Sequence, residues 1–261
     1  MQLPIFQVDA FTDRVFGGNP AAVVPLEAWL DDGVMQAVAA ENALSETAFV
    51  VREGHGWRIR WFTPVAEVAL CGHATLATAS VLFEEGMVAG DELRLESRSG
   101  TLRVLREGGL YVLDFPALRP EPIDPDPALA AALGREPLEL WKARDHIAVL
   151  EDEDEVRALT PDLAALGRHE GYAVIATAPG RTCDFVSRFF APKVGVPEDP
   201  VTGSAHCELT PLWSARLGRT LLEARQLSAR GGALRCEDRG GRVRIGGRAV
   251  RYLDGSIRVP G

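Results

Sequence analysis

Two glycine turns and one isolated carboxylate supply the residue types that could do chemistry in this chain. Glu46 precedes a largely apolar stretch typical of an interior strand, and apolar surroundings raise a carboxyl pKa toward the range useful for moving a carbon-bound proton. His73 follows Gly72, and Ser204 follows Gly203, each at the start of a segment with helical spacing. Helix starts offer unpaired N–H groups that favour an anion. These residues predict proton transfer on a small, negatively charged molecule.

The same residues also have plainer structural interpretations. A carboxylate at the start of a strand is usually solvated, and a histidine at a helix start often caps the helix or packs in the core. Ser204 taken alone would be an N-capping serine. Asp199, before Pro200, is either a turn initiator or a carboxylate directed into a cleft, and Asn19 is first of all a turn residue, with ligand contact as the alternative.

The remaining histidines are weaker candidates. His206 falls one turn into the second glycine-opened helix, and His55 lies between glycines in a turn, where it is expected to be exposed. His146 and His169 belong to no partner pattern, so core or surface positions are favoured for both.

A repeat indicates which elements must position the candidate residues. The stretch from Arg60 to Pro64 recurs from Arg188 to Pro192, a shift of 188 − 60 = 128 residues, close to half of the 261-residue chain. The glycine turns are 203 − 72 = 131 residues apart, so the second copy carries three extra residues, which we place within 198–200. The shift of 128 sets Val174 opposite Glu46, which leaves the carboxylate without an acidic counterpart. The repeat predicts a pseudo-symmetric cleft with one helix start on each side.

Hydrophobic periodicity and turn residues give the expected elements. Five prolines from Pro116 to Pro127 interrupt regular structure and mark a linker. We therefore expect domains over 1–118 and 119–261, with the last strands able to return to the first domain. The predicted helices cover 27–44, 72–85, 152–166 and 203–217, and the predicted strands cover 3–11, 20–26, 47–51, 57–62, 138–150, 172–177 and 184–190, with further β-structure over 92–115 and 227–259.

Composition excludes several classes of function. The net charge of −9 and pI of about 5.2 disfavour nucleic acid and anionic membranes as partners, so a small molecule is the expected one. The absence of a long apolar run and of a signal segment favours a soluble, cytoplasmic protein. The cysteines show no C-x-x-C interval, which argues against a zinc knuckle or a disulfide framework. No Walker loop, G-x-G-x-x-G, H-E-x-x-H or G-x-S-x-G motif occurs, which removes the usual nucleotide, zinc-protease and α/β-hydrolase interpretations.

An ordered set of short segments resembles the PhzF-like isomerase family, which is related in fold to diaminopimelate epimerase. The resemblance covers essentially the whole chain. The segments are Val8-Asp-Ala-Phe-Thr12, Gly18-Asn-Pro-Ala-Ala-Val23, Leu44-Ser-Glu-Thr-Ala-Phe49, Leu70-Cys-Gly-His-Ala-Thr75, Leu95-Glu-Ser-Arg-Ser-Gly100, Leu113-Asp-Phe-Pro116, Gly195-Val-Pro-Glu-Asp-Pro-Val-Thr-Gly-Ser-Ala-His206 and Gly240-Gly-Arg-Val-Arg-Ile-Gly-Gly247.

The resemblance implies an α+β fold of two pseudo-symmetric domains, each a curled sheet or barrel around a central helix, in a homodimer without cofactor or metal. It implies that Glu46 shuttles the proton, that His73, Asp199 and Ser204 complete the catalytic set, and that Gly72 and Gly203 supply N–H groups. Asn19 and Ser45 join the two glycines as candidate substrate-binding residues. The family's name reaction moves a proton between ring carbons of a dihydro-hydroxyanthranilate in phenazine synthesis, so proton transfer on a carboxylate-bearing metabolite is better predicted than any one substrate.

Two other functions remain open. Cys71 precedes the first glycine turn, where epimerases of this architecture keep a catalytic thiol, so a thiol-dependent epimerase or dehydratase is a rival. Adding 131 to 71 gives Thr202 and not a cysteine, which disfavours a two-thiol mechanism. A thiol pKa well below the ordinary value would support this rival. The second alternative is a small-molecule binding protein that kept the cleft and lost the chemistry.

Overall fold

The computed structural model describes residues 1–54 and 56–260, which divide into two compact units. Unit 1 comprises Met1–Asp114 together with the C-terminal segment that begins at Gly246, and unit 2 comprises Phe115–Ile245. His55, expected in an exposed turn, lies outside the described residues. No helix in the described ranges is long and apolar enough to cross a membrane.

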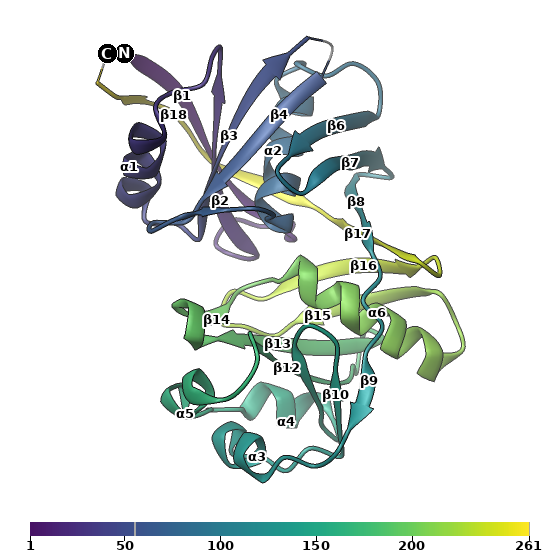
Figure 1. Ribbon diagram of the computed structural model, residues 1–261. Helices are drawn as coiled ribbons and strands as arrows, with labels where there is room; N and C mark the ends of the chain where they lie inside the picture. The colour runs from purple at the N-terminus through teal and green to yellow at the C-terminus, as the bar shows by residue number, and fades with distance from the viewer. Residues whose placement is uncertain (55, 261) are drawn as a thin grey trace. The chain divides into compact units, whose positions relative to one another are not determined.

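A mixed sheet forms the frame of unit 1 (Figure 1). Its strands are β1 (Gln2–Ala10), β2 (Asn19–Leu26), β3 (Glu46–Glu53), β4 (Gly56–Phe62), β5 (Glu67–Val68), β6 (Glu92–Ser97), β7 (Gly100–Glu107), β8 (Leu110–Pro116) and β18 (Ala249–Arg258). The order is β18, β1, β2, β3, β4, β6, β7, β8, and β5 pairs with β4. The pairs β2–β3 and β4–β6 are parallel, and the others are antiparallel.

Two helices pack on the strands of unit 1. The first, α1 (Asp32–Asn42), contacts β3 and β4, and the second, α2 (Gly72–Glu84), contacts β1, β2 and β3. Every residue of α2 from His73 to Phe83 is buried, as its apolar sequence predicts. Strand β3 is buried from Thr47 to Val51 without alternation, which is the pattern of a strand covered on both faces. Glu46, the first residue of β3, therefore lies where an enclosed strand begins.

Unit 2 repeats this plan. Its strands are β9 (Glu121–Ile123), β10 (Glu139–Lys142), β11 (His146–Val149), β12 (Val174–Pro179), β13 (Phe185–Ala191), β14 (Val196–Asp199), β15 (Leu221–Gln226), β16 (Gly232–Asp238) and β17 (Arg242–Gly247), and its helices are α3 (Pro127–Leu133), α4 (Glu153–Ala158), α5 (Leu163–Arg168), the 3-10 turn η1 (Pro192–Val194) and α6 (Gly203–Leu217). The order is β9, β10, β11, β12, β13, β15, β16, and β14 pairs with β13. The parallel pairs β11–β12 and β13–β15 correspond to β2–β3 and β4–β6 of unit 1. Helix α6 packs on β15 and β16 and ends at Gly218, whose left-handed backbone forms the C-cap.

The repeated Arg-x-Phe motif forms the same ion pair in each unit. Arg60 donates two hydrogen bonds, of 2.9 and 2.8 Å, to the carboxylate of Glu67, and its guanidinium lies over the ring of Phe62. Arg188 donates two bonds of 2.7 and 2.9 Å to Glu198 and lies over Phe190. Glu198 is thus the counterpart of Glu67, at a shift of 198 − 67 = 131.

This correspondence corrects two alignments expected from the sequence. Corresponding residues of the two copies are 128 positions apart at Phe190 and 131 positions apart at Glu198. The three extra residues therefore lie between Phe190 and Glu198, in the segment that holds η1, and not within 198–200 as predicted. Strand pairing also shows that Thr47 faces Phe62 and that Val174 faces Phe190, so Val174 corresponds to Thr47. The counterpart of Glu46 is therefore Ala173, which still leaves the carboxylate without an acidic partner position.

Several predicted elements have different bounds. The helix predicted over 27–44 starts only at Asp32 because the side chain of Asp31 accepts a hydrogen bond from the Gly33 N–H and caps it. The segment 152–166 forms α4 and α5 in place of one helix, since Pro161 interrupts it. The strand predicted over 138–150 is the hairpin of β10 and β11, and β15 was not predicted.

The proline-rich segment is anchored within unit 2. It contains β9, which pairs with β10, although five prolines led us to expect a linker without strand structure. Pro211 inside α6 has no N–H to offer the carbonyl of Cys207 four residues earlier, and that carbonyl accepts the N–H of Leu118 at 3.0 Å. The missing hydrogen bond at Pro211 thus leaves the Cys207 carbonyl available to anchor the proline-rich segment.

Candidate functional site

Glu46 and His73 meet in unit 1. Glu46 begins β3 beside Ala21 of β2, and His73 is the second residue of α2. The Nε2 atom of His73 lies 3.1 Å from Oε2 of Glu46, and these side chains are 7% and 17% exposed. Within the described residues neither atom has another hydrogen-bond partner. The candidate base and the candidate histidine therefore form one buried pair.

Cys71 completes a chain of three side chains. Its Sγ lies 3.6 Å from Nδ1 of His73, so the imidazole contacts the thiol with one nitrogen and the carboxylate with the other. The potential ligand atoms of the three residues lie within 4.8 Å of one another. A metal ion takes one nitrogen of a histidine ring, whereas here the two nitrogens are shared between two partners. The arrangement suits a hydrogen-bonded chain better than a metal centre.

The pKa of Glu46 is shifted opposite to the direction expected from its apolar surroundings. Burial acts to raise it, but the charge of His73 and the hydrogen bonds from His73 and Cys71 outweigh burial and lower the pKa. Burial acts to lower the pKa of His73, but Cys71 and Glu46 together raise it well above the ordinary value. The expected raised pKa of Glu46 is wrong, because the pair is stabilised as carboxylate and imidazolium.

Cys71 itself is a poor candidate for a thiolate. Its burial, followed by the negative charge of Glu46, raises the pKa of the thiol to about 11. The condition that would have supported a thiol mechanism, a lowered thiol pKa, is not met.

The starts of α2 and α6 differ from those of the other α-helices in the described part of the chain. Asp31, Asp126, Asp152 and Asp162 cap α1, α3, α4 and α5 with their side chains. Neither Cys71 before α2 nor Thr202 before α6 makes a side-chain cap. The two helices that correspond in the repeat thus lack the carboxylate cap that the other four described α-helices carry.

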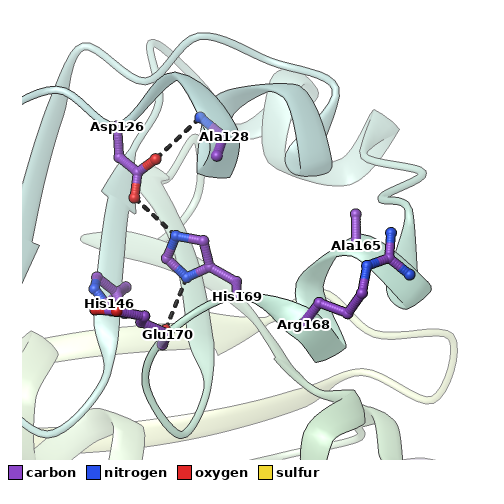
Figure 2. Close-up of a pocket in the computed structure, with 7 residues that line it drawn as sticks. All are labelled: Asp126, Ala128, His146, Ala165, Arg168, His169 and Glu170. Atoms are coloured by element: carbon purple, nitrogen blue, oxygen red, sulfur yellow. Dashed lines mark hydrogen bonds and ion pairs between the residues drawn. The ribbon is translucent and has the colours of Figure 1, made fainter.

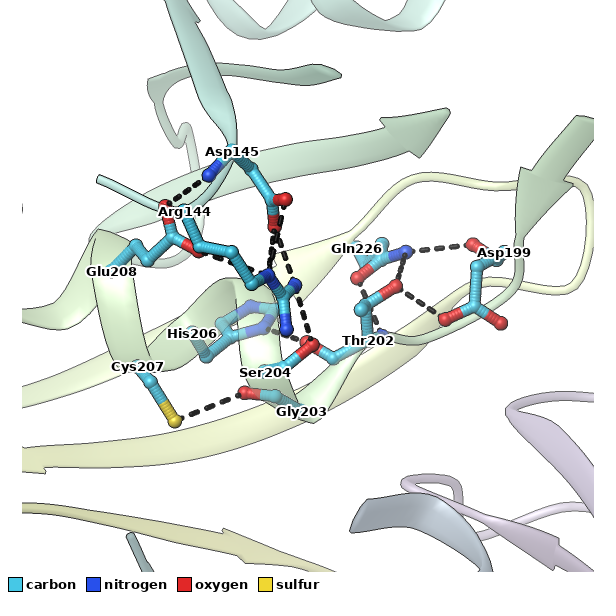
Figure 3. Close-up of polar contacts among 10 residues, drawn as sticks. All are labelled: Arg144, Asp145, Asp199, Thr202, Gly203, Ser204, His206, Cys207, Glu208 and Gln226. Atoms are coloured by element: carbon cyan, nitrogen blue, oxygen red, sulfur yellow. Dashed lines mark hydrogen bonds and ion pairs between the residues drawn. The ribbon is translucent and has the colours of Figure 1, made fainter. Parts of the chain in front are cut away.

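Asp199 lies at the end of β14, close to the start of α6 (Figure 3). Its carboxylate accepts a hydrogen bond from the hydroxyl of Thr202. Gln226 donates to the backbone carbonyl of Asp199 at 2.7 Å and accepts the N–H of Thr202 at 2.9 Å. The residue is therefore held by the strand and by the helix start, and it does more than begin a turn.

Ser204 is not the N-cap of α6, which corrects the plainer interpretation of this serine. Thr202 occupies the N-cap position, and Ser204 is the second residue of the helix. The Ser204 hydroxyl accepts a hydrogen bond of 3.1 Å from Nη2 of Arg144 (Figure 3). Sequence reasoning missed Arg144, because no motif surrounds it and it lies 60 residues from Ser204.

His206 is buried on the inner side of the same helix start. Its Nδ1 lies 2.8 Å from the carbonyl oxygen of Thr202, and burial lowers its pKa to about 4. A neutral imidazole that donates to the backbone is a structural support.

The candidate residues thus form two sets. Unit 1 holds Glu46, His73 and Gly72, with Ser45 directly before Glu46 and the buried Asn19 at the start of the adjacent strand β2. Unit 2 holds Asp199, Gly203 and Ser204.

A separate hollow of about 430 Å³ lies in unit 2 (Figure 2). It is lined by Asp126, Ala128, His146, Ala165, Arg168, His169 and Glu170. The rings of His146 and His169 pack edge to face with centroids 5.1 Å apart, and Nε2 of His169 lies 2.7 Å from the Asp126 carboxylate. The two histidines do have partners, which the sequence did not indicate. Since Asp126 also caps α3, these contacts connect that helix to the loop after α5.

Comparison with known proteins identifies the family. The family model described as phenazine biosynthesis-like protein (PhzC-PhzF) matches residues 8–255. An uncharacterised isomerase of Pseudomonas aeruginosa is 56% identical over 260 residues, which cover 99% of this chain and 100% of that protein. The crystal structure of a PhzF family phenazine biosynthesis protein from Enterococcus faecalis is 50% identical, with a TM-score of 0.98 over 99% of this chain and 100% of its own.

The fold extends beyond close relatives. A hydroxyproline epimerase from Agrobacterium vitis, crystallised with trans-4-hydroxy-L-proline, has a TM-score of 0.63 at 11% identity, covering 98% of this chain and 92% of that one. The predicted α+β fold class, shared with epimerases, is confirmed. The chain belongs to the phenazine biosynthesis-like (PhzC-PhzF) family.

Proposed function

We propose that the protein is a cofactor-independent isomerase that moves a proton between carbon atoms of a small, carboxylate-bearing molecule. The observation that carries the proposal is the buried contact of Glu46 with His73 at the start of α2, a helix without a side-chain cap. Relatives named as isomerases support the class of reaction.

The proton has a defined route in this proposal. Glu46 begins as a carboxylate because His73 lowers its pKa, and it removes a proton from one carbon of the substrate. The negative charge left on the substrate is stabilised by the imidazolium of His73 and by the N–H groups at the start of α2, a helix without a side-chain cap. Glu46, now a carboxylic acid, returns the proton to a second carbon. The residue and the substrate each end with the proton count they began with, so the shift needs no electron carrier.

We propose that Gly72, Asn19 and Ser45 bind substrate in unit 1, and that Asp199, Ser204 and the backbone of Gly203 are the ligand-binding residues of unit 2. The support is the repeat, which gives α2 and α6 corresponding starts without side-chain caps. Asp199 and Ser204 have no acidic or hydroxyl counterparts at Val68 and His73, so the two sets would recognise different chemical groups.

The decisive test is proton exchange at carbon. Small-molecule metabolites are incubated with the protein in D₂O, and the uptake of deuterium at carbon is followed by NMR and mass spectrometry. We expect Glu46→Gln to lower the rate by at least about a hundredfold, because the amide keeps the shape but cannot carry the proton. Glu41→Gln, which alters an exposed carboxylate of α1, is the matched control and should exchange like the wild type. Exchange at the wild-type rate by folded Glu46→Gln protein would refute the assignment.

The same assay separates the alternatives. A thiol-dependent epimerase would lose exchange in Cys71→Ser, whereas Glu46 chemistry retains it, and the raised pKa of Cys71 favours the second outcome. A non-catalytic binding protein would show no exchange at all. The resemblance also leads us to propose a homodimer that acts in the cytoplasm, and light scattering after gel filtration measures the assembly.

A further inference from the structure

We propose that Arg144 determines specificity for an anionic substrate, by donating hydrogen bonds from its guanidinium to an acidic group of the ligand at the start of α6. This inference rests on the proposed function, since it names the residue of unit 2 that would recognise the carboxylate of the proposed substrate.

Arg144 is held in one orientation before any ligand arrives. Its Nε and Nη2 both donate to the carboxylate of Asp145, a residue with no exposed side-chain area, and its guanidinium lies 5.1 Å from the ring centroid of Tyr172. A fixed guanidinium loses little conformational freedom when it binds a carboxylate.

The guanidinium keeps donors for a ligand. Nη2 reaches Ser204 and Asp145, while Nη1 has no hydrogen-bond partner among the residues that the structure describes. The side chain of Arg144 is 40% exposed, so an outside molecule can reach it. Its position beside Ser204 places it at the end of α6 where the N–H groups have no capping side chain, and both features favour an anion.

The cluster that Arg144 forms with its buried neighbours has no net negative charge. Asp145 offsets the charge of Arg144, while burial and the proximity of Asp145 raise the pKa of Glu208 to about 8, so Glu208 is mainly a neutral acid near pH 7. An ionised Glu208, 3.9 Å from Nε of Arg144, would make this cluster negative and repel an anion.

The repeat gives independent support. Thr47 pairs with Ala22, and its counterpart Val174 pairs with His146, so His146 corresponds to Ala22. Counting back two residues, Arg144 corresponds to Pro20, next to Asn19. Arg144 of unit 2 therefore lies next to the position that corresponds to Asn19, a candidate substrate-binding residue of unit 1.

Binding of benzoate and of its uncharged isostere benzamide tests the inference by calorimetry. The wild type should prefer benzoate, and Arg144→Gln should weaken benzoate binding by at least about tenfold while benzamide binding changes little. Arg144→Lys should bind benzoate with intermediate affinity, because lysine keeps the positive charge but lacks the paired N–H donors of the guanidinium. This variant also keeps the test decisive if Arg144→Gln fails to fold. Arg216→Gln is the matched control, since Arg216 also pairs with a carboxylate, Glu139, and stacks on an aromatic ring, but lies at the far end of α6.

Three outcomes would overturn the inference: no preference of the wild type for benzoate, unchanged benzoate affinity in both Arg144 variants, or an equal loss of benzamide binding. Binding does not require turnover, so these outcomes are distinct from a failure of the proton-exchange test with Glu46→Gln.

Discussion

The protonation state of Glu46 depends mainly on His73, with a smaller effect of Cys71. Apolar surroundings predict a raised pKa, but His73, 27 positions later in the chain, reverses the direction from a distance of 3.1 Å. Sequence spacing could suggest that both residues belong to the site. Sequence spacing could not give the distance between the two side chains, which decides whether burial or the charge of His73 has the larger effect on the pKa of Glu46.

Replacement of His73 should therefore change the pH dependence of proton exchange. In His73→Asn the burial of Glu46 is no longer opposed by an imidazolium, so the pKa of the carboxyl rises. A base that must be ionised then loses activity at a higher pH than before, and the acidic limb of the pH–rate profile shifts upward. The profile of deuterium uptake measures this shift. His169→Asn serves as the control, and an unmoved or lowered acidic limb in His73→Asn would contradict the pairing.

At the scale of elements, the duplicated ion pair shows how much of the fold the sequence could predict. The Arg-x-Phe repeat was enough to predict two similar units and the starts of α2 and α6. The carboxylate partners were missed, because η1 places Glu198 ten residues after Arg188, whereas Glu67 follows Arg60 by seven. Allowing a gap of three residues before Glu198 would have revealed the pair. Arg144 had no such signal, since only the hairpin of β10 and β11 brings it to α6.

The two ion pairs should differ in their contribution to stability. Arg188 also donates a hydrogen bond of 2.7 Å to the carbonyl of Leu159 at the end of α4, whereas the additional partner of Arg60 is the exposed Asp32. Arg188→Met leaves a partly buried carbonyl without its donor, so it should lower the free energy of unfolding by about 1 kcal/mol more than Arg60→Met. Urea titrations of both variants measure the difference. Equal losses would mean that the bond to α4 contributes nothing.

At the scale of the whole molecule, unit 1 is assembled from both ends of the chain. Strand β18 pairs with β1 along its length, and the N-terminal amino group of Met1 donates to the carbonyl of Val259 at 2.6 Å. Unit 2 is one continuous stretch of chain. A fragment that ends near residue 120 would therefore lack a strand of its own sheet, and its inactivity would not by itself prove that both units share the chemistry.

Removal of residues 249–261 should unfold unit 1 selectively. The truncation exposes the edge of β1 and removes its partner, while unit 2 retains all its residues. Hydrogen exchange should become fast in β1, β2 and β3 and stay slow in β12 and β13. Placing residues 246–260 before Met1 through a short Gly/Ser connection should restore protection, because the chain ends are adjacent. Slow exchange throughout the truncated protein would show that β18 is dispensable.

The pairing of β1 with β18 also sets the order in which the protein can be completed on the ribosome. Strand β1 leaves the exit tunnel before its partner β18, with a delay on the order of ten seconds or more at ordinary rates of translation. Unit 2 can fold during that interval, whereas the edge of β1 stays open to other chains. A nascent-chain chaperone would accordingly be needed most for unit 1, whose sheet closes only after β18 has been synthesised.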